Sequence, residues 1–360
     1  MRRIVPLLAC SLAAPMAQAA GPSFSDVLVN SGISVAGHVS GSYTAGFNKG
    51  QTLSFRAFDS KSDSFDLNQA WLNVGYQPTE GFGGVVTTMA GTDASGVNAS
   101  YGVGSSDFSL VQGFMQYASG PFTIQAGRYV TLSGFEVIDD TQNTNISRSL
   151  LFQNAEPLVH TGVRTATKLG STTTLYLGVN NSALSGAAND NNKEKTAEAG
   201  FAFTPSSAVS LAVYDYYGID PQPAHKTNLF DFVGSFQVSS AVQLAVNADW
   251  ARFIGAGATV AGVAGYLNVA WSDSFKTSLR AEYLKTTNFV VPADTSDNKS
   301  NLTEVTLTGD YAATKSFDLL AEVRLDNSNH KVFAFDDDVK KQQPDVAIKA
   351  IYKFGTPSGS

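Results

Sequence analysis

The chain has a single cysteine, few charges and no long apolar run after its first residues, and each shortage excludes a class of protein. Cys10 lies near the N-terminus, so the remaining chain cannot form disulfide bonds. Only 15% of the residues are charged, against about 25% in soluble domains. No later stretch of about 18 apolar residues occurs, which argues against a transmembrane helix. The net charge of −7 argues against nucleic acid as a partner.

The N-terminal residues have the features of a secretory signal peptide. Arg2 and Arg3 precede an apolar stretch, and Ala17-Gln18-Ala19 is a small-residue cleavage site. A lipoprotein site at Cys10 would leave too short an apolar region before it. We therefore expect a signal peptide over residues 1–19, a short periplasmic helix over 20–32, a β-barrel over 33–354 and a C-terminal tail over 355–360.

From residue 33 onward, polar and apolar residues alternate with a period of two, which is typical of half-buried strands. The segments divide into about sixteen strands, and the connections between them are alternately short and long. Short turns opposite long loops are characteristic of an up-and-down antiparallel barrel that crosses a membrane. An even number of strands also brings both chain ends to the same side, where they can pair.

The polar residues of each strand face water in either of two architectures. In a soluble sandwich the apolar face packs against a second sheet, whereas in a membrane barrel it faces lipid and the polar face lines the lumen. Aromatic residues gather near both ends of the strands, as in the aromatic girdles of membrane barrels. This favours an all-β transmembrane barrel, with a secreted β-sandwich as the alternative.

Six short segments, spread over most of the chain, resemble a known family. They are Leu28-Val29-Asn30-Ser31-Gly32-Ile33, Phe65-Asp66-Leu67-Asn68-Gln69-Ala70-Trp71-Leu72, Gly127-Arg128-Tyr129, Gly134-Phe135-Glu136, Ser147-Arg148-Ser149-Leu150-Leu151-Phe152 and Pro157-Leu158-Val159-His160-Thr161-Gly162. In them the chain resembles the second OmpL-like β-barrel porin family. The resemblance implies a bacterial outer-membrane barrel that acts as a passive channel. Leu132, where members often have proline, and the residues after Phe354 depart from the pattern.

The connection over residues 130–157 is unusually long for a compact domain, which indicates a functional loop. We expect it to fold into the mouth of the barrel and narrow the pore. Its acids would then face bases across the constriction and create a transverse field. The candidate constriction residues are Arg128, Glu136, Asp139, Asp140, Arg148, His160 and Arg164. In the alternative, the loop stays outside and its acids are solvated.

Two arginines of this set have alternative placements. Strict alternation places Arg128 outward, on the external rim, but a bulge at Gly127 would turn it into the lumen, and we favour the lumen. Arg148 either lines the pore or anchors the loop to a carboxylate of the wall. We favour the anchor, because a buried polar loop needs such ties.

The inner wall is expected to carry charges of both signs. His160, Arg164 and Lys168 share one face of their strand and should form a basic ladder. The candidate wall residues are Lys168, Asp249, Lys276, Arg280, Glu282, Asp318, Glu322 and Arg324. Strong ion selectivity is not expected from such a mixture, although acidic external loops favour cations slightly.

The sequence predicts a porin for small hydrophilic solutes and ions in the bacterial outer membrane, in contact with lipid and lipopolysaccharide. No enzyme, cofactor or metal site is expected, because the histidines lie far apart without a catalytic motif. The cluster at residues 336–338 is expected to be solvated or to meet lipopolysaccharide-bridging cations. A homotrimer is expected by analogy only. The alternative function is a surface adhesin or structural barrel with a closed lumen.

Overall fold

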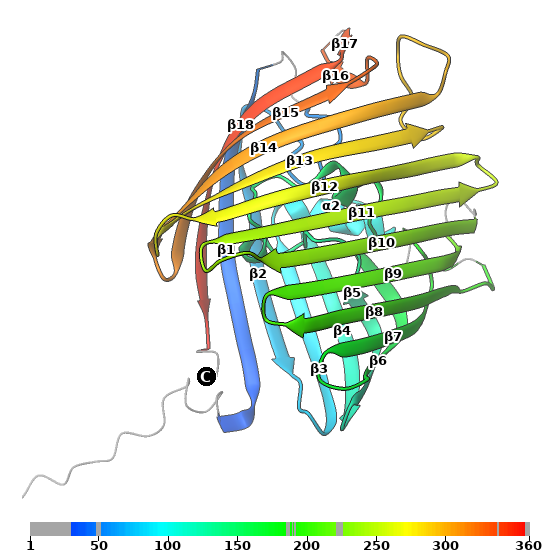
Figure 1. The fold of residues 1–360 in the computed structure, drawn as a ribbon, viewed down its shortest axis with the longest axis vertical. Coiled ribbons are helices and arrows are strands. Elements are labelled where there is room, and N and C mark those ends of the chain that lie inside the picture. Colours follow the sequence, from blue (N-terminus) through cyan, green and yellow to red (C-terminus); the bar gives the residue numbers. More distant parts are fainter. Residues whose placement is uncertain are drawn as a thin grey trace, which may run out of the picture.

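The computed structural model describes residues 30–47, 52–184, 188, 190, 192–220, 226–336 and 338–356. Its barrel strands are β1 (Ile33–Gly46), β2 (Ser64–Tyr76), β3 (Gly81–Ala90), β4 (Phe108–Ser119), β5 (Phe122–Val130), β6 (Val159–Lys168), β7 (Thr173–Asn180), β8 (Thr196–Ser206), β9 (Val209–Ile219), β10 (Lys226–Gln237), β11 (Val242–Ile254), β12 (Ala258–Ala270), β13 (Phe275–Thr287), β14 (Lys299–Thr314), β15 (Phe317–Ser328) and β18 (Gln342–Gly355). They form one closed antiparallel barrel (Figure 1), which confirms the predicted architecture. β18 closes it by pairing with β15 on one side and β1 on the other.

The remaining elements lie in the connections. They are α2 (Thr92–Tyr101), the 3-10 helix η1 (Asp140–Gln142), α3 (Leu150–Asn154) and a small hairpin of β16 (Phe333–Phe335) and β17 (Asp338–Lys340). The expected signal peptide, residues 1–19, lies outside the described residues. Of the helix expected over residues 20–32, Asn30 and Ser31 are described and helical, and Gly32 follows with a φ of 71°. Within the described residues, no helix is long and apolar enough to cross a membrane.

Short and long connections alternate around the barrel, as expected. Ser119 and Phe122 are joined by two residues, and most other turns at that end are comparably short. At the opposite end, the connections run from the brief β11–β12 turn to the long segment between Val130 and Val159. We call these the short-turn end and the long-loop end.

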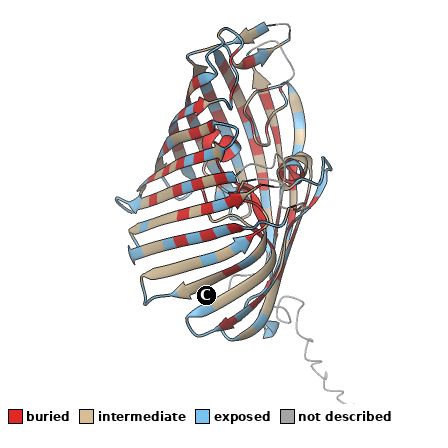
Figure 2. Ribbon diagram, turned by 90° about the vertical axis from the view of Figure 1, so that its right-hand side faces the viewer, coloured by how far each residue is buried: buried red, intermediate tan, exposed pale blue. Residues whose placement is uncertain are grey.

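Buried and exposed residues alternate along strands such as β13 and β14 (Figure 2), with apolar residues on the outer face and polar residues on the inner face. Leu279, Leu307 and Val323 occupy one row across β13, β14 and β15, and all three are exposed on the outside. Three residues farther along β13, a second row faces the inside and is buried; it consists of Glu282, Glu304 and Asp326. In a membrane barrel the outer face contacts lipid and must be apolar, whereas the inner face can carry charges. The two rows have this arrangement.

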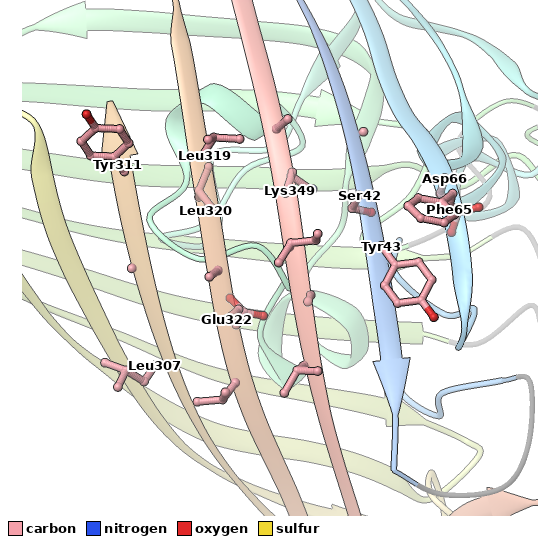
Figure 3. A pocket seen from close by; sticks show the side chains of 18 of the residues that line it. Ser42, Tyr43, Phe65, Asp66, Leu307, Tyr311, Leu319, Leu320, Glu322 and Lys349 are labelled. Carbon is pink, nitrogen blue, oxygen red and sulfur yellow. The ribbon is translucent and has the colours of Figure 1, made fainter. Parts of the chain in front are cut away.

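The outer face carries an apolar groove over β14, β15, β18 and β1, with a volume of about 990 Å³ (Figure 3). The surface is hollowed there because Gly41, Gly309 and Ala321 have little or no side chain, while Tyr43 and Tyr311 border the groove. The groove lies on the lipid-facing side of the wall, away from the polar lumen. It is therefore part of the membrane surface of the barrel.

The lumen near the long-loop end contains an apolar core. Leu150 and Leu151 of α3 are fully buried and cluster with wall residues such as Leu229 and Val260. Gly262 on β12 permits this approach, because a Cβ atom there would lie 2.9 Å from a methyl carbon of Leu151. The inside of the barrel is thus packed, and is not lined by polar side chains alone.

The lipid-facing position of Leu307 leads to a stability prediction. Leu307 lies near the middle of β14, so Leu307→Arg places a charge in hydrocarbon and should cost about 2–4 kcal/mol of unfolding free energy. Denaturant unfolding in lipid vesicles measures this cost. Ser240→Arg, in an exposed turn, is the matched control and should cost about 0–1 kcal/mol. Equal costs for the two variants would contradict the assignment of this face to lipid.

Candidate functional site

Residues 131–158, here called the inner loop, connect β5 to β6 and run along the inside of the wall. The backbone N–H of Leu132 donates to the Tyr216 hydroxyl on β9 (3.3 Å). The N–H of Gly134 donates to the Asp231 carboxylate on β10 (3.2 Å). Farther along, the Asn145 amide donates to the Thr308 hydroxyl on β14 (2.7 Å). The inner loop therefore reaches the wall opposite the strands that it connects.

Two carboxylates of the wall accept hydrogen bonds from loop backbone. Glu322 on β15 accepts from the N–H groups of Ile146 (2.7 Å) and Ser147 (3.0 Å). Glu282 on β13 accepts from those of Leu150 and Leu151, both at 2.7 Å. These last amides begin α3 and have no partner within the helix. Each wall carboxylate thus satisfies two amides that would otherwise be buried without a partner.

Glu136 of the inner loop binds a wall arginine. Its Oε1 accepts from Arg280 Nη1 on β13 at 2.6 Å, and its Oε2 accepts from the Ser149 N–H at 2.6 Å. Arg280 also donates to Glu304 and to the carbonyl of Ser147. All of these groups are buried, so the charges are balanced locally by hydrogen-bonded partners.

Asp140 binds two groups of the wall and one of its own loop. It accepts from the Ser40 hydroxyl on β1 (2.6 Å), from Lys349 Nζ on β18 (2.9 Å) and from Arg148 Nη2 (2.9 Å). Burial would raise the pKa of Asp140, but Lys349 and Arg148 outweigh it and hold the pKa well below its usual range. Burial and the nearby Asp140 charge raise the pKa of Asp93, in the β3–β4 loop, to about 6.

Arg148 fastens the inner loop to itself. Besides Asp140, it donates to the carbonyls of Val137 (2.9 Å), Ile138 (2.9 Å) and Ile146 (3.2 Å). The expected anchor to a wall carboxylate is therefore wrong in its partner. The Arg148 guanidinium binds carbonyl and carboxylate oxygens of its own loop. Asp140, in turn, is the residue that binds the wall.

Asp139 is the most exposed acid of the η1 region and caps it. Its carboxylate accepts from the Thr141 N–H at 2.8 Å and lies 3.6 Å from His38 Nδ1 on β1. Its side chain has a relative exposure of 14%. Of the three predicted loop acids, Asp139 alone has no arginine or lysine ion pair among the described residues.

The predicted pairing of the loop acids with the bases of β6 is wrong. Arg164 forms an ion pair with Glu198 on β8, and its guanidinium carbon lies 4.3 Å from the Tyr129 ring centre. His160 is fully buried and stacks on Tyr216, with ring centres 4.8 Å apart. Both residues lie on the inner wall as expected. The acids do not face them because the inner loop crosses to β1, β13 and β18, where other bases lie.

Arg128 is not in the lumen, contrary to the interpretation that we favoured. It pairs with Thr161 across β5 and β6, whereas the neighbouring pair, Tyr129 and His160, is the one that faces inward. Gly127 has a φ of 135°, but the strand register does not shift there. The alternation therefore continues through Gly127. The Arg128 guanidinium lies over the Tyr101 ring, 3.6 Å from its centre.

The other predicted wall residues divide between the buried network and the short-turn end. Arg324 is buried and donates to the Arg148 carbonyl at 2.6 Å. Asp249 is buried on β11. The residues near the short-turn end are Lys168 and Lys276, both exposed, and Asp318, which pairs with Lys353 at 2.5 Å.

Three cavities lie along the inner loop. The outer cavity, about 560 Å³, is lined by α2, α3 and residues near the long-loop end such as Phe253 on β11. The middle cavity, about 150 Å³, is lined by Trp71, Gln112 and loop residues including Val137 and Asp139. The lower cavity, about 460 Å³, is lined by residues 141–144 and polar groups of the short-turn end. Phe152 and Leu158 border the first two, and Gln142 borders the last two.

Sequence reasoning missed two further loops that enter the network. Arg56, between β1 and β2, forms buried ion pairs with Asp59, Asp326 and Asp345. Asp93 at the start of α2 accepts from Gln69 on β2 at 2.9 Å. Arg56 and Asp93 lie in long polar loops. Charged residues in such loops are usually expected to be solvated, so the sequence did not single them out. In the described part of the chain, no three His, Cys, Asp or Glu side chains are arranged to hold a metal ion.

The chain matches solved structures of outer-membrane proteins over most of its length. OprB of Pseudomonas putida, in a high-pH structure, is 11% identical with a TM-score of 0.64, over 91% of this chain and 96% of that one. A loop-deletion mutant of OmpT, an outer membrane protein of Vibrio cholerae, is 12% identical with a TM-score of 0.60, over 89% and 99%. A mutant of Rh. blastica porin is 12% identical with a TM-score of 0.55, over 89% and 100%. At these identities the likeness shows the fold.

A family model covers almost the whole barrel. The model described as "Putative beta-barrel porin-2, OmpL-like" matches residues 32–354. No match is found among curated proteins.

Removing the Glu322 carboxylate should loosen the inner loop. Glu322→Ala leaves the buried amides of Ile146 and Ser147 without acceptors, at a cost of about 1–3 kcal/mol for each. Hydrogen exchange at these two amides should accelerate, while exchange in β14 stays unchanged. Asp318→Ala on the same strand is the control and should leave both amides protected. Unchanged exchange in Glu322→Ala would show that these bonds do not hold the loop.

The lowered pKa of Asp140 predicts acid release of the same loop. Ionised Asp140 contributes to docking above its ordinary pKa of about 4, and the contribution is lost as the pH falls through the lowered value. Lys349→Met removes one cation, so the loss should begin at a higher pH than in the wild type. Hydrogen exchange of residues 138–142 across an acid titration measures the shift. Coincident titrations of the two proteins would contradict the role of Lys349.

Proposed function

Because the chain belongs to the OmpL-like beta-barrel porin-2 family, we propose that its barrel is a water-filled channel for passive diffusion of small hydrophilic solutes and ions. The protein is a β-barrel of the bacterial outer membrane, and the proposal assigns it no catalytic step. The long-loop end would face outward and the short-turn end the periplasm.

One observation supports the proposal most directly: the inner loop crosses the barrel between an outer and a lower cavity. The outer and lower cavities are about 560 and 460 Å³, and the middle cavity between them is about 150 Å³. A wide entrance, a narrow passage and a wide exit are the elements of a size-selective pore. In this proposal the inner loop is the constriction.

In this proposal, most charged side chains of the constriction fix the position of the inner loop and do not line the passage. Glu136, Asp140 and Arg148 are engaged with partners and buried, so they fix the loop. Glu136 and Asp139 both border the middle cavity, together with Gln112 and Gln142, and Asp139 is the one without an arginine or lysine partner among the described residues. Uncharged polar solutes and small cations suit such a lining better than anions.

The alternative function is a surface adhesin or structural barrel with a closed lumen. The small middle cavity and its apolar border, which includes Trp71, Ile138 and Phe152, favour this alternative. Liposome swelling in sugars of increasing size separates the two functions. Sugar entry supports a porin, and no entry from folded, inserted protein supports the closed barrel.

We also propose a homotrimer embedded in lipid and lipopolysaccharide. One of the solved neighbours is a trimer form of OmpT from Vibrio cholerae. Cross-linking in native membranes tests this assembly. A single monomeric species after cross-linking would exclude it.

The passage between the middle and lower cavities predicts the effect of changing Gln142, which is exposed and borders both. In planar bilayers the wild type should give stepwise currents. Gln142→Ala should raise the unit conductance and Gln142→Trp should lower it, each roughly twofold, because the pore diameter changes. Ser171→Trp, also exposed but in the β6–β7 turn of the short-turn end and outside the three cavities, is the control and should conduct like the wild type. Wild-type conductance in both Gln142 variants would exclude this passage, and no currents at all would exclude the porin.

A further inference from the structure

Three buried carboxylates meet where the inner loop returns to the wall. Asp231 on β10 and Asp249 on β11 are directly opposite each other in the strand register. Glu156, near the end of the inner loop, lies against them. Their relative exposures are 0%, 4% and 7%. Like charges directly opposite on neighbouring strands repel each other, so this position needs an explanation.

The hydrogen bonds at the cluster leave one oxygen of each acid unused. Asn247 Nδ2 donates to Glu156 Oε1 (3.0 Å) and to Asp249 Oδ2 (2.7 Å). The Gly134 N–H donates to Asp231 Oδ2 (3.2 Å). The buried oxygens without a hydrogen-bond partner are Glu156 Oε2, Asp231 Oδ1, Asp249 Oδ1 and Asn247 Oδ1. Leaving several buried acceptors unpaired is costly, which indicates that hydrogen-bond donors are missing.

The charged and titratable surroundings supply no cation. The groups that face the cluster from other elements are Glu136 of the inner loop, Tyr214 on β9, Tyr266 on β12 and Glu282 on β13. None of the three acids forms an ion pair with a described residue. Two arginines of the buried network are engaged with other acids: Arg280 binds Glu136 and Glu304, and Arg56 binds three other aspartates.

Protons are the counter-ions that fit the geometry. Asn247 bridges Glu156 and Asp249, and Asp231 lies directly opposite Asp249, so the three carboxyl groups are gathered at one place. Ionised carboxylates only accept hydrogen bonds, so the unpaired oxygens can be satisfied within the cluster only if a carboxyl group keeps its proton and donates it. A metal ion fits less well, because these acids are not arranged to hold one. We propose that Glu156, Asp231 and Asp249 form a proton-binding site that docks the end of the inner loop on β10 and β11 at neutral pH.

The site joins both arms of the inner loop. Gly134 on the outgoing arm has a φ of 92°, and a Cβ atom there would lie 1.9 Å from Glu156 Oε2 on the returning arm. The two arms are thus in contact at the acid that binds the proton. Ionised Glu156 cannot move away from Asp249 without moving this part of the inner loop.

The pH dependence has the opposite sign to that of Asp140. Burial, with Asp249 and Asp231 nearby, raises the pKa of Glu156 well above its ordinary value. A carboxyl group with a raised pKa binds its proton more tightly in the docked state. The contribution of this site to docking is therefore full below the ordinary pKa of a carboxyl group and is lost as the pH rises through the raised pKa. The inner loop should be most firmly held above the acid range that protonates Asp140 and below the pH range that ionises this site.

Infrared spectroscopy of the folded barrel in lipid tests the site without using its conductance. At about pH 7, where an ordinary carboxyl group is ionised, the wild type should show the C=O stretch of protonated carboxyl groups. Glu156→Gln and Asp249→Asn should each lose part of this band, by about the intensity of one carboxyl group. Asp297→Asn, whose side chain is 62% exposed in an external loop, is the matched control and should keep it.

Three results would overturn the site. They are a wild type without the band at neutral pH, a band of equal intensity in the variants and the wild type, and a band that disappears when calcium is added at constant pH. The last would mean that a cation, not a proton, is the counter-ion.

A current measurement extends the test, and this step rests on the proposed function. Wild-type conductance should change over the pH range in which the infrared band is lost, whereas Glu156→Gln, whose amide donates permanently, should stay constant. If the band behaves as expected and no variant conducts, the proton site stands and the porin function fails. Equal pH dependence in wild type and Glu156→Gln would overturn the coupling of this site to the inner loop.

Discussion

The backbone amides of the inner loop require acceptors once the loop lies inside the barrel, and two wall glutamates supply them. Glu322 and Glu282 each accept two N–H groups from the segment between Ile146 and Leu151. A buried amide without a partner costs about as much as a lost hydrogen bond. The carboxylates therefore make an irregular segment tolerable inside the wall. The rest of the lumen is arranged around this requirement.

Arginines and acids around these amides fix the position of the inner loop more than they stabilise the fold. Replacing a whole buried ion pair is often neutral, whereas removing one partner costs about 3–5 kcal/mol. Arg280 and Arg324 each bind both a wall acid and a loop carbonyl. A displaced loop would leave several of these charges without partners at once. The network thus favours one position of the loop over its alternatives.

The sequence predicted the barrel because alternation is local, and it predicted less of the site because contacts in the lumen are not. The parity of β13 and β15 placed Arg280, Glu282, Glu322 and Arg324 correctly on the inner wall. The sequence could not indicate which loop residue would contact each of these wall residues. Those contacts depend on the path of the inner loop, whose sequence has no periodic pattern. The acids were accordingly assigned to His160 and Arg164 instead of to Arg280 and Lys349. Arg128 was misplaced because a glycine with positive φ was taken for a bulge that the register lacks.

A cysteine placed on the inner loop tests most directly whether this loop lines the route through the barrel. Val137 borders the middle cavity and is 36% exposed. The only native cysteine, Cys10, lies in the expected signal peptide, so Val137→Cys would carry the one thiol of the mature chain. A cationic thiol reagent added during single-channel recording should lower the current in one irreversible step. Complete modification by mass spectrometry with an unchanged current would contradict the account.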